Sequence, residues 1–381
     1  MGVLLKKIIF ENCRTKIESI CLMTTTDSLN IQIEKTSHSS IHKVDFDQLP
    51  FGKYFGDHMF SALFRNEAWS DFRILPFGPI SMHPSMAALH YGQSIFEGMK
   101  AYRADNGDIL LFRPWENARR LNRSAERLCM ATIPEEYFMD ALSTLIDIDR
   151  EWVSGREGHS LYIRPFMFAS EAILGVRPAQ EYTFMIFTSP VGNYYNSPVK
   201  LMLETHYSRA TKGGTGTAKA AGNYAAALYP AKLGQLKGYS QQLWTDSSTH
   251  QFIEESGTMN IFFVMNGKLI TPSLESDTIL SGITRDSIIQ VARHWRVPVE
   301  ERAISVDELD DAIQSGALTD MFGAGTAATI AHVELVNIRG VDRVLPDIKT
   351  RQLSNDIARF LSDIRTGKAD DIFEWTYRLP R

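Results

Sequence analysis

Residues 211–227 read TKGGTGTAKAAGNYAAA, and no other stretch of the chain has so unusual a composition. Four glycines flank a single lysine, Lys219, and the other charged residue nearby is Lys212. Burial disfavours an ammonium ion, so a lysine among small uncharged residues is a candidate for a nucleophilic amine, and small neighbours let a bulky cofactor approach the backbone. The alternative is a flexible surface loop in which Lys219 is solvated. A phosphate-binding P-loop is excluded, because that motif needs Gly-Lys-Ser/Thr and Lys219 lies between two alanines.

Two adjacent acids stand out further along the chain, in residues 254–264, which read EESGTMNIFFV. A Ser-Gly-Thr turn and an apolar strand follow them. A carboxylate beside a core strand must be paired or hydrogen-bonded, because burying a bare charge is costly. Glu254 or Glu255 is therefore a candidate partner for a positively charged ring nitrogen. The alternative is an exposed turn with two solvated acids.

Two glycine turns supply candidate anion sites. In 280–292, LSGITRDSIIQVA, Gly282 opens an amphipathic helix, whose first N–H groups and the Thr284 hydroxyl can bind an anion. In 322–329, FGAGTAAT, a second glycine turn carries Thr326. Either segment alone fits an ordinary turn. Together with an isolated lysine and a semi-buried acid, they suit a small cofactor that bears both a phosphate and a cationic ring.

Arginines cluster just after residues 91–103, YGQSIFEGMKAYR. The stretch 111–128 reads LFRPWENARRLNRSAERL and predicts a helix over 117–130, with an apolar stripe on one side. By default, a helix turns its charges to solvent. One arginine of the cluster can instead bind a phosphate as a bidentate fork. The cluster consists of Arg113, Arg119, Arg120, Arg123 and Arg127.

Length, charge and cysteine usage narrow the class of protein. At about 150 residues per domain, the 381 residues predict two domains, and 44% hydrophobic residues are ordinary for a globular chain. A formal net charge of -5 argues against a nucleic-acid-binding protein. Three cysteines without a C-x-x-C favour a reducing, cytoplasmic compartment and predict no metal site. No run approaches the roughly 18 apolar residues of a membrane span.

Strand and helix signals are mixed along the chain, which predicts an α+β or mixed α/β fold. Asn266-Gly267 between two apolar runs predicts a hairpin, and Ser305 with Glu308 forms a capping box. Further strands are expected at 108–112, 161–168, 183–188 and 200–204, and further helices at 305–316 and 350–366. The expected organisation is a leader of uncertain status that is dispensable to the fold (1–22), an N-terminal domain (23–190), a linker rich in Ser, Pro, Gly and Asn (191–199) and a C-terminal domain (200–381).

Taken together, these segments resemble the branched-chain amino acid aminotransferases, pyridoxal 5′-phosphate enzymes of fold type IV. The resemblance covers nearly all of 45–375 and rests on seven segments in the same order. It implies a smaller N-terminal α/β domain and a larger C-terminal pseudo-barrel domain that binds the cofactor. It also implies reversible transfer of the amino group of leucine, isoleucine or valine to 2-oxoglutarate through a Schiff base, which gives the branched 2-oxo acid and glutamate. A homodimer or higher homo-oligomer is expected, with no nucleic-acid or membrane partner.

The resemblance also implies a role for individual residues. Lys219 would form the Schiff base and act as the catalytic base, Glu255 would pair with the pyridinium nitrogen, and Tyr224 would bind the phenolic oxygen. The phosphate would be held by Arg120, by the amide of Ile283 and by the amide and hydroxyl of Thr284, with the Thr326 hydroxyl serving phosphate or substrate. The substrate α-carboxylate would bind the amides of Thr326 and Ala327, assisted by Tyr162. The side-chain pocket would be lined by Phe96, Tyr91 and Tyr194, with Arg164 meeting the distal carboxylate of glutamate.

Alternatives within fold type IV are a D-amino acid aminotransferase and an aminodeoxychorismate lyase. Those enzymes are shorter and are not expected to combine LFRPWENARR, GNYAAA and ESGTMNIFF in one chain. Another alternative is a binding protein that keeps the fold without turnover, although the presence of both Lys219 and Glu255 argues against it. Mammalian members carry a redox-active cysteine pair where this chain has Ala328 and Ala331, so thiol regulation there is not expected.

Overall fold

The computed structural model describes residues 29–192 and 197–381. The chain divides into two compact units, Met1–Asn30 and Ile31–Arg381. Of the first unit, only residues 29 and 30 are described, and the predicted leader over 1–22 lies outside the described residues. The second unit carries every helix and strand discussed below. Within the described ranges, no helix is both long and apolar enough to cross a bilayer.

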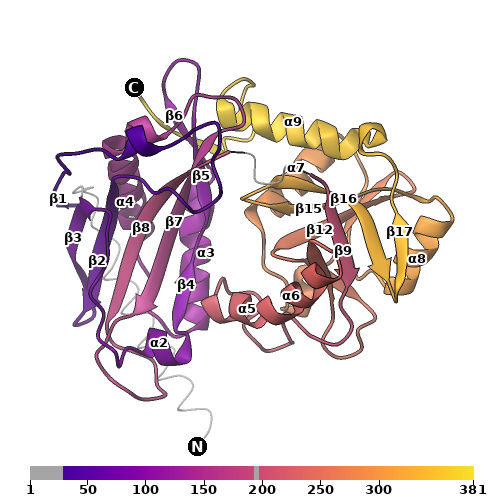
Figure 1. Cartoon of the computed structure of the whole chain (residues 1–381), viewed down its shortest axis with the longest axis horizontal. Helices are drawn as coiled ribbons and strands as arrows, with labels where there is room; N and C mark the ends of the chain where they lie inside the picture. Colours follow the sequence, from indigo (N-terminus) through magenta and orange to yellow (C-terminus); the bar gives the residue numbers. More distant parts are fainter. Residues whose placement is uncertain (1–28, 193–196) are drawn as a thin grey trace, which may run out of the picture. The chain divides into compact units, whose positions relative to one another are not determined.

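Nine strands form the first sheet, and in Figure 1 all of them except the yellow β18 are drawn in indigo to magenta. The strands pair in the order β1–β3–β2–β8–β7–β5–β6–β18, and β4 pairs with β7. The last strand of the chain thus lies beside β6, at an edge of a sheet built otherwise from the N-terminal half. The bounds are β1 (Gln32–Ile33), β2 (His58–Arg65), β3 (Ala68–Pro76), β4 (Ser94–Phe96), β5 (Met99–Arg103), β6 (Ile109–Phe112), β7 (Ser160–Ala169), β8 (Tyr182–Val191) and β18 (Thr376–Leu379).

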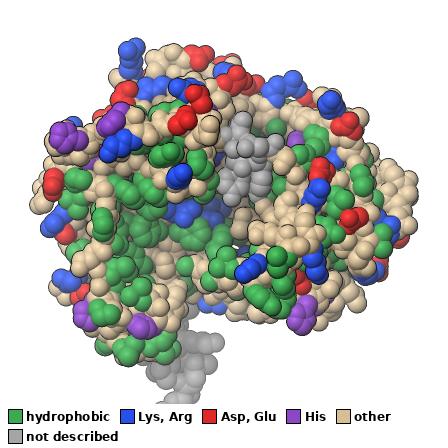
Figure 2. Space-filling model, in the orientation of Figure 1, with side chains coloured by type: hydrophobic (Ala, Val, Ile, Leu, Met, Phe, Trp, Pro, Cys, Tyr) green, Lys and Arg blue, Asp and Glu red, His purple; other side chains and the backbone are tan. Residues whose placement is uncertain are grey.

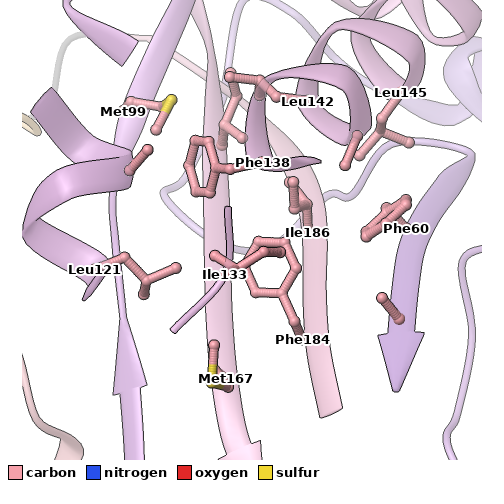
Figure 3. Close-up of a cluster of buried hydrophobic side chains, with 14 of the residues drawn as sticks. Phe60, Met99, Leu121, Ile133, Phe138, Leu142, Leu145, Met167, Phe184 and Ile186 are labelled. Atoms are coloured by element: carbon pink, nitrogen blue, oxygen red, sulfur yellow. The ribbon is translucent and has the colours of Figure 1, made fainter. Parts of the chain in front are cut away.

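Two helices, α3 (Pro114–Arg127) and α4 (Glu135–Ile148), bury their apolar stripes against one face of this sheet. The core between these helices and the sheet is mostly aliphatic, with phenylalanine rings among the aliphatic side chains (Figure 3). Phe184 of β8 lies with its ring centroid 5.8 Å from that of Phe138 on α4 and 6.0 Å from that of Phe60 on β2. All three rings are fully buried, which anchors α4 across β2 and β8.

The second sheet closes on itself. Its strands pair in the order β11–β10–β9–β16–β15–β12–β13–β14, and β11 also pairs with β12, so that six strands form a ring. This closure gives the barrel-like sheet expected from the sequence, and the mixed α/β class is confirmed. The bounds are β9 (Val199–Leu203), β10 (Gln241–Thr245), β11 (Ile253–Ser256), β12 (Met259–Met265), β13 (Lys268–Thr271), β14 (Val299–Glu301), β15 (Leu318–Gly325), β16 (Thr329–Ile338) and β17 (Val341–Val344), which pairs with β16.

Helix α9 (Gln352–Thr366) connects the two sheets, because it packs against β5 and β6 of the first and β16 of the second (Figure 1). The remaining α-helices are α2 (Ala87–Tyr91), α5 (Ala221–Ala226), α6 (Leu228–Leu236), α7 (Ile283–His294) and α8 (Val306–Gln314). Short 3₁₀ turns are η1 (Ile41–Lys43), η2 (Arg150–Trp152), η3 (Leu274–Ser276) and η4 (Ile348–Thr350).

The local signals read from the sequence are confirmed. Asn266 and Gly267 both have positive φ, 51° and 74°, and join β12 to β13 in an antiparallel hairpin. The Ser305 hydroxyl accepts a hydrogen bond from the Glu308 amide at 3.0 Å, which caps α8. Gly367, with a φ of 72°, ends α9. The four strands expected from apolar runs correspond to β6, β7, β8 and β9.

The cap of α8 provides a test of the fold. Ser305→Ala removes the side-chain acceptor of an otherwise unpaired helix N–H, so we expect the free energy of unfolding to fall by about 1 kcal/mol. Urea unfolding followed by circular dichroism measures the change. Ser305→Asp keeps an acceptor and should stay within a few tenths of a kcal/mol of the original protein. Equal losses in both variants would contradict the capping role.

Candidate active site

The largest concentration of predicted site residues surrounds a cavity of about 640 Å³ where the two sheets face each other. Its walls come from β4, β7 and the loop before β5 in the first sheet, and from the β11–β12 and β15–β16 turns of the second. The lining includes Phe96, Tyr162, Arg164, Lys219, Tyr224, Thr326 and Ala327. On the face shown in Figure 2, Lys and Arg side chains gather at the bottom of a hollow beside a hydrophobic surface.

The backbone of Lys219 is held from both sides by the first sheet and its helix α3. Its N–H donates to the Ser124 hydroxyl at 2.9 Å, and its carbonyl accepts from the Phe96 N–H at 3.0 Å. The side chain is half-buried, and Nζ donates to the Tyr224 hydroxyl at 2.7 Å. Tyr224 lies in the first turn of α5, which begins two residues after the lysine. Lys219 is therefore a fixed group facing a cavity, and the solvated-loop alternative is wrong.

Asn223 holds the glycine-rich segment in shape. Its Nδ2 donates to the carbonyls of Thr215 and Ala218, at 2.7 and 2.9 Å. From the first-sheet side, Arg127 donates to the carbonyls of Gly213 and Gly214, at 2.9 and 2.8 Å. Hydrogen bonds from polar side chains thus hold these small residues from both sides. One arginine of the predicted cluster is used to hold this loop.

The two acids of β11 point in opposite directions, because successive side chains of a strand alternate between its faces. Glu255 lines a second cavity, which shares Tyr224 and Thr258 with the first. Its Oε2 lies 2.5 Å from Nη2 of Arg209, and its Oε1 accepts from Asn260 at 3.1 Å. Glu254 accepts instead from the Thr278 hydroxyl at 2.5 Å and lines neither cavity.

Burial raises the pKa of Glu255 to about 7, although the charge of Arg209 opposes this shift and that of Glu254 adds to it. The residue Glu255 is 4% exposed, and it lines the same cavity as Tyr224. A carboxyl group with a pKa of about 7 is partly ionised near neutral pH, so a nearby cation changes its ionised fraction strongly. A positively charged ring nitrogen placed in the cavity would favour its ionised form.

Arg120 is the buried member of the arginine cluster, with 4% exposure. Its Nε and Nη2 bind the two carboxylate oxygens of Glu97 at 2.7 and 2.8 Å, and Nη1 donates to the Ser281 carbonyl at 3.1 Å. Burial opposes the ionisation of Glu97, but Arg120 outweighs it and lowers the pKa of that carboxyl. The guanidinium thus lies just before α7, with its charge balanced by Glu97.

The start of α7 offers free amides beside this pair. Gly282 precedes the helix in an extended conformation, and Ile283 and Thr284 are its first residues, whose N–H groups have no acceptor within the helix. These two residues and Thr326 line a third cavity, of about 300 Å³. A helix N-terminus with a threonine hydroxyl is a suitable place for a phosphate group.

Strand β7 presents the candidate substrate residues through its period-two alternation. Leu161, Ile163 and Met167 point into the core beneath α3 and α4, so Tyr162 and Arg164 point to the opposite face, toward the cavity. Nη2 of Arg164 donates to the Tyr162 hydroxyl at 2.9 Å. The guanidinium carbon also lies 4.8 Å from the centroid of the Phe96 ring. Nε of Arg164 is a buried donor with no hydrogen-bond acceptor among the described residues, which suits an incoming anion.

Most predicted site residues in the described parts of the chain are therefore brought together, and Tyr91 is not. Tyr91 is 46% exposed and lines a different cavity, next to Cys129 and Val176. Tyr194 lies outside the described residues. The sequence analysis missed Arg209, Glu97 and Asn260, whose partners are distant in the chain. In the described parts of the chain, no cluster of three or more His, Cys, Asp or Glu side chains can hold a metal ion.

Comparison with known families defines the class of protein. Residues 94–333 match the family model described as amino-transferase class IV. This match covers more than half of the chain, which therefore belongs to the class IV aminotransferases. A similar relative is branched-chain-amino-acid transaminase 1 of Bacillus subtilis (strain 168), which is 45% identical over 351 residues, or 91% of this chain and 98% of the relative.

Solved structures lead to the same class. The branched-chain amino acid aminotransferase of Escherichia coli matches with a TM-score of 0.70 and 26% identity, over 84% of this chain and 98% of that one. The branched-chain amino acid aminotransferase of Thermobaculum terrenum, solved in its PLP (holo) form, matches with a TM-score of 0.67 over 86% and 99% of the two chains. At 21% identity, this second likeness shows the fold alone.

The pKa of Glu255 generates a prediction for the protein freed of any cofactor. Its value in the folded state is raised from the usual 4.5 to about 7, so the folded protein binds more protons than the unfolded chain between these limits. The free energy of unfolding that Glu255 contributes therefore falls as pH rises from about 5 to about 8. Over this range, we expect the free energy of unfolding of the original protein to fall relative to that of Glu255→Gln, by up to about 3 kcal/mol. Urea unfolding at several pH values measures it, and parallel pH profiles would refute the prediction.

Proposed function

We propose that the protein is a branched-chain-amino-acid aminotransferase that uses pyridoxal 5′-phosphate and moves the amino group of leucine, isoleucine or valine to 2-oxoglutarate. The observation that carries this proposal is the fixed amine of Lys219, which bonds the Tyr224 hydroxyl in a cavity adjoining buried Glu255. The chain around this cavity is 45% identical to a branched-chain-amino-acid transaminase over nearly the whole relative.

The residues of the site fit the proposed cofactor at three points. Glu255 offers a buried carboxylate for the ring nitrogen, and Tyr224 a hydroxyl for the phenolic oxygen. The first amides of α7, at Ile283 and Thr284, offer free donors for the phosphate, and the Thr326 hydroxyl can add to them. Arg120 lies beside these donors through its contact with Ser281. When bound, pyridoxal 5′-phosphate supplies an aldehyde that condenses with amines and a ring that stabilises negative charge at the adjacent carbon.

The side chains around the cavity would transfer the proton, support the cofactor ring and bind the substrate carboxylate. Lys219 is the lysine among the described residues that line the larger cavity, so its Nζ is the base that takes the proton from the substrate α-carbon. Glu255 in its ionised form would keep a proton on the ring nitrogen of the cofactor, while Arg209 and Asn260 hold the carboxylate in place. The amides of Thr326 and Ala327 receive the substrate α-carboxylate, and Tyr162 assists from the opposite wall.

One pocket must accept both an apolar branched chain and the carboxylate of 2-oxoglutarate. Phe96 and Tyr162 give it aromatic walls that a leucine side chain can contact. Arg164, whose guanidinium carbon lies 4.8 Å from the Phe96 ring centroid and whose buried Nε has no acceptor among the described residues, gives a cation at the edge of the same pocket. A planar guanidinium can contact an apolar group through its face and bind a carboxylate through the N–H groups at its edge.

We also propose a cytoplasmic homodimer or higher homo-oligomer. Tyr91 is exposed and lies outside its own chain's cavity, so it can line a side-chain pocket only across an interface between two copies. Exposed apolar side chains near it support such an interface, namely Leu89, Leu174 and Val176, which are 55%, 65% and 88% exposed. The reducing compartment follows from the scarcity of cysteine.

Two domains are proposed on the basis of the strand assignments. Strand β8 ends at Val191 in the first sheet, and β9 begins at Val199 in the second. Residues 23–190 and 200–381 would then form the domains, with 191–199 as the connection between them. Only β18 departs from this division among the described strands, because it returns to the first sheet.

Turnover of leucine with 2-oxoglutarate tests the function directly. The purified protein loaded with pyridoxal 5′-phosphate should form glutamate and 4-methyl-2-oxopentanoate, which coupled assays measure. Lys219→Ala should stay folded and lose at least about 100-fold in rate, because it lacks the proton-transferring amine. Lys212→Ala, at the exposed lysine of the same segment, is the control. An undiminished rate in Lys219→Ala would refute the assignment of Lys219 as the catalytic base.

Arg164 generates a prediction about specificity. Arg164→Ala removes the edge cation, so kcat/KM for 2-oxoglutarate and glutamate should fall by about 10- to 100-fold, the value of a charge-assisted hydrogen bond. The half-reaction with leucine should change far less, because its side chain brings no charge to the pocket. Rapid-mixing measurements of the two half-reactions separate these effects. Equal losses for both substrates would show that Arg164 has another role.

A further inference from the structure

The third cavity contains two cations that the proposed function leaves without a role. It is lined by Ile283 and Thr284, the proposed phosphate donors, and by Thr326. It is also lined by Lys100 of β5 and Arg365 of α9. No aspartate or glutamate of the described chain is among its lining residues. The two cations therefore share a cavity of about 300 Å³ with the place proposed for the phosphate.

Lys100 reaches the cavity because of its place on β5. Met99 and Ala101 of this strand belong to the core of the first sheet, so Lys100 projects from the opposite face. There, its Nζ donates to the carbonyl of Ala327 at 2.7 Å. A carbonyl accepts one of the three N–H groups of an ammonium but carries no net charge. This contact therefore leaves the positive charge of Lys100 unbalanced.

Arg365 lies buried in the last turn of α9, and its partners are neutral too. Its Nη1 donates to the Thr329 hydroxyl at 2.5 Å, and its guanidinium carbon lies 4.3 Å from the centroid of the Phe112 ring. Tyr102 is a further hydrogen-bond partner, and burial raises the pKa of its hydroxyl, which stays neutral. Nε is a buried donor with no acceptor among the described residues. The C-terminal end of a helix adds only a partial negative charge.

Arg120, the arginine expected at the phosphate, is already neutralised within the protein. Its Nε and Nη2 bind the two carboxylate oxygens of Glu97, which is fully buried. Asn117 donates to the same carboxylate at 2.7 Å. A bidentate pair of this kind has no net charge. Arg120 can therefore donate a hydrogen bond to a phosphate, but together with Glu97 it adds no net positive charge to the site.

The charge of a bound phosphate matches what these residues leave unbalanced. A phosphate monoester carries about 1.5 to 2 negative charges at neutral pH. Moving such an anion out of water is costly unless opposite charge is present. Burying cations without a counter-ion is costly for the same reason. Lys100 and Arg365 together carry two positive charges, so the phosphate and the two cations balance each other when the phosphate occupies the cavity.

We propose that Lys100 and Arg365 are the countercharges of the cofactor phosphate and keep it in its doubly ionised form. The amides of Ile283 and Thr284 then orient the phosphate, whereas these two side chains balance its charge. This inference rests on the proposed function, since it concerns the cofactor of the same site. Nearby cations favour the dianion, so the second pKa of the bound phosphate lies below its value of about 6 in water.

The test is phosphorus NMR of the holoenzyme, loaded with pyridoxal 5′-phosphate, from pH 5.5 to pH 8. The original protein should show one chemical shift over this range, because its bound phosphate stays doubly ionised. Arg365→Gln removes the charge and keeps a hydrogen-bond donor. In this variant the pKa of the phosphate should rise into the range, so that the signal moves with pH. On dilution, the variant should release the cofactor with a Kd at least about 10-fold higher.

Further variants separate the charge from a merely structural role. Lys100→Met removes the other cation and should also make the phosphorus signal move with pH. Arg365→Lys keeps a cation and should keep the signal constant. Thr329→Ala removes the hydrogen-bond partner of Arg365 but no charge, so the signal should again stay constant. Arg359→Gln, at an exposed arginine of the same helix that pairs with Asp356, should behave like the original protein.

A pH-independent signal with an unchanged Kd, in either Arg365→Gln or Lys100→Met, would overturn the proposal. Equal effects of Arg365→Gln and Thr329→Ala would also overturn it, since they would assign Arg365 a structural role. If Arg365→Gln does not fold, Lys100→Met decides alone. Cofactor binding and leucine turnover by the original protein are measured in parallel. Binding and turnover without any effect of the two cations refute this inference alone, whereas absent binding or turnover refutes the proposed function itself.

Discussion

The site depends on one short stretch of backbone pairing between the two sheets. The Phe96 N–H binds the Lys219 carbonyl, and the Lys219 N–H binds Ser124, so that the lysine of the second half of the chain is fixed by β4 and α3 of the first. Without these bonds, the glycine-rich segment would have little to hold it, because its residues are too small to pack a core of their own. The cavity, the orientation of Tyr224 and the reach of Nζ all follow from this contact.

Buried charge is distributed unevenly around that contact. Two pairs are balanced, Glu97 with Arg120 and Glu255 with Arg209, and each carboxylate oxygen in them has a donor. Balanced pairs can be buried at modest cost, whereas a lone charge cannot. Lys100, Arg164 and Arg365 have no acid partner among the described residues around the cavities, so the site as a whole carries an excess of positive charge. Its proposed occupants, a phosphate and two kinds of carboxylate, are anionic.

The sequence predicted what depends on local chemistry and missed what depends on distant partners. The hairpin at Asn266-Gly267 was predicted because both residue types tolerate positive φ. The β2–β3 hairpin was not, because its turn uses Asn66 and Glu67, and glutamate at a φ of 61° has no sequence signal. Lys219 and the neighbouring motifs were recognised as a set. Arg209 was missed, since nothing in its own neighbours shows that it meets Glu255, 46 residues away. Tyr91 was placed in the pocket by resemblance, but it is exposed and lines a different cavity of this chain.

The position of β18 has a consequence for how the molecule is made. Thr376–Leu379 pairs with β6, so the first sheet receives its edge strand from residues that follow the whole second sheet along the chain. A ribosome releases the N-terminal strands long before these residues have left its exit tunnel. The first sheet therefore lacks the outer partner strand of β6 until the strands of the second sheet have also been synthesised.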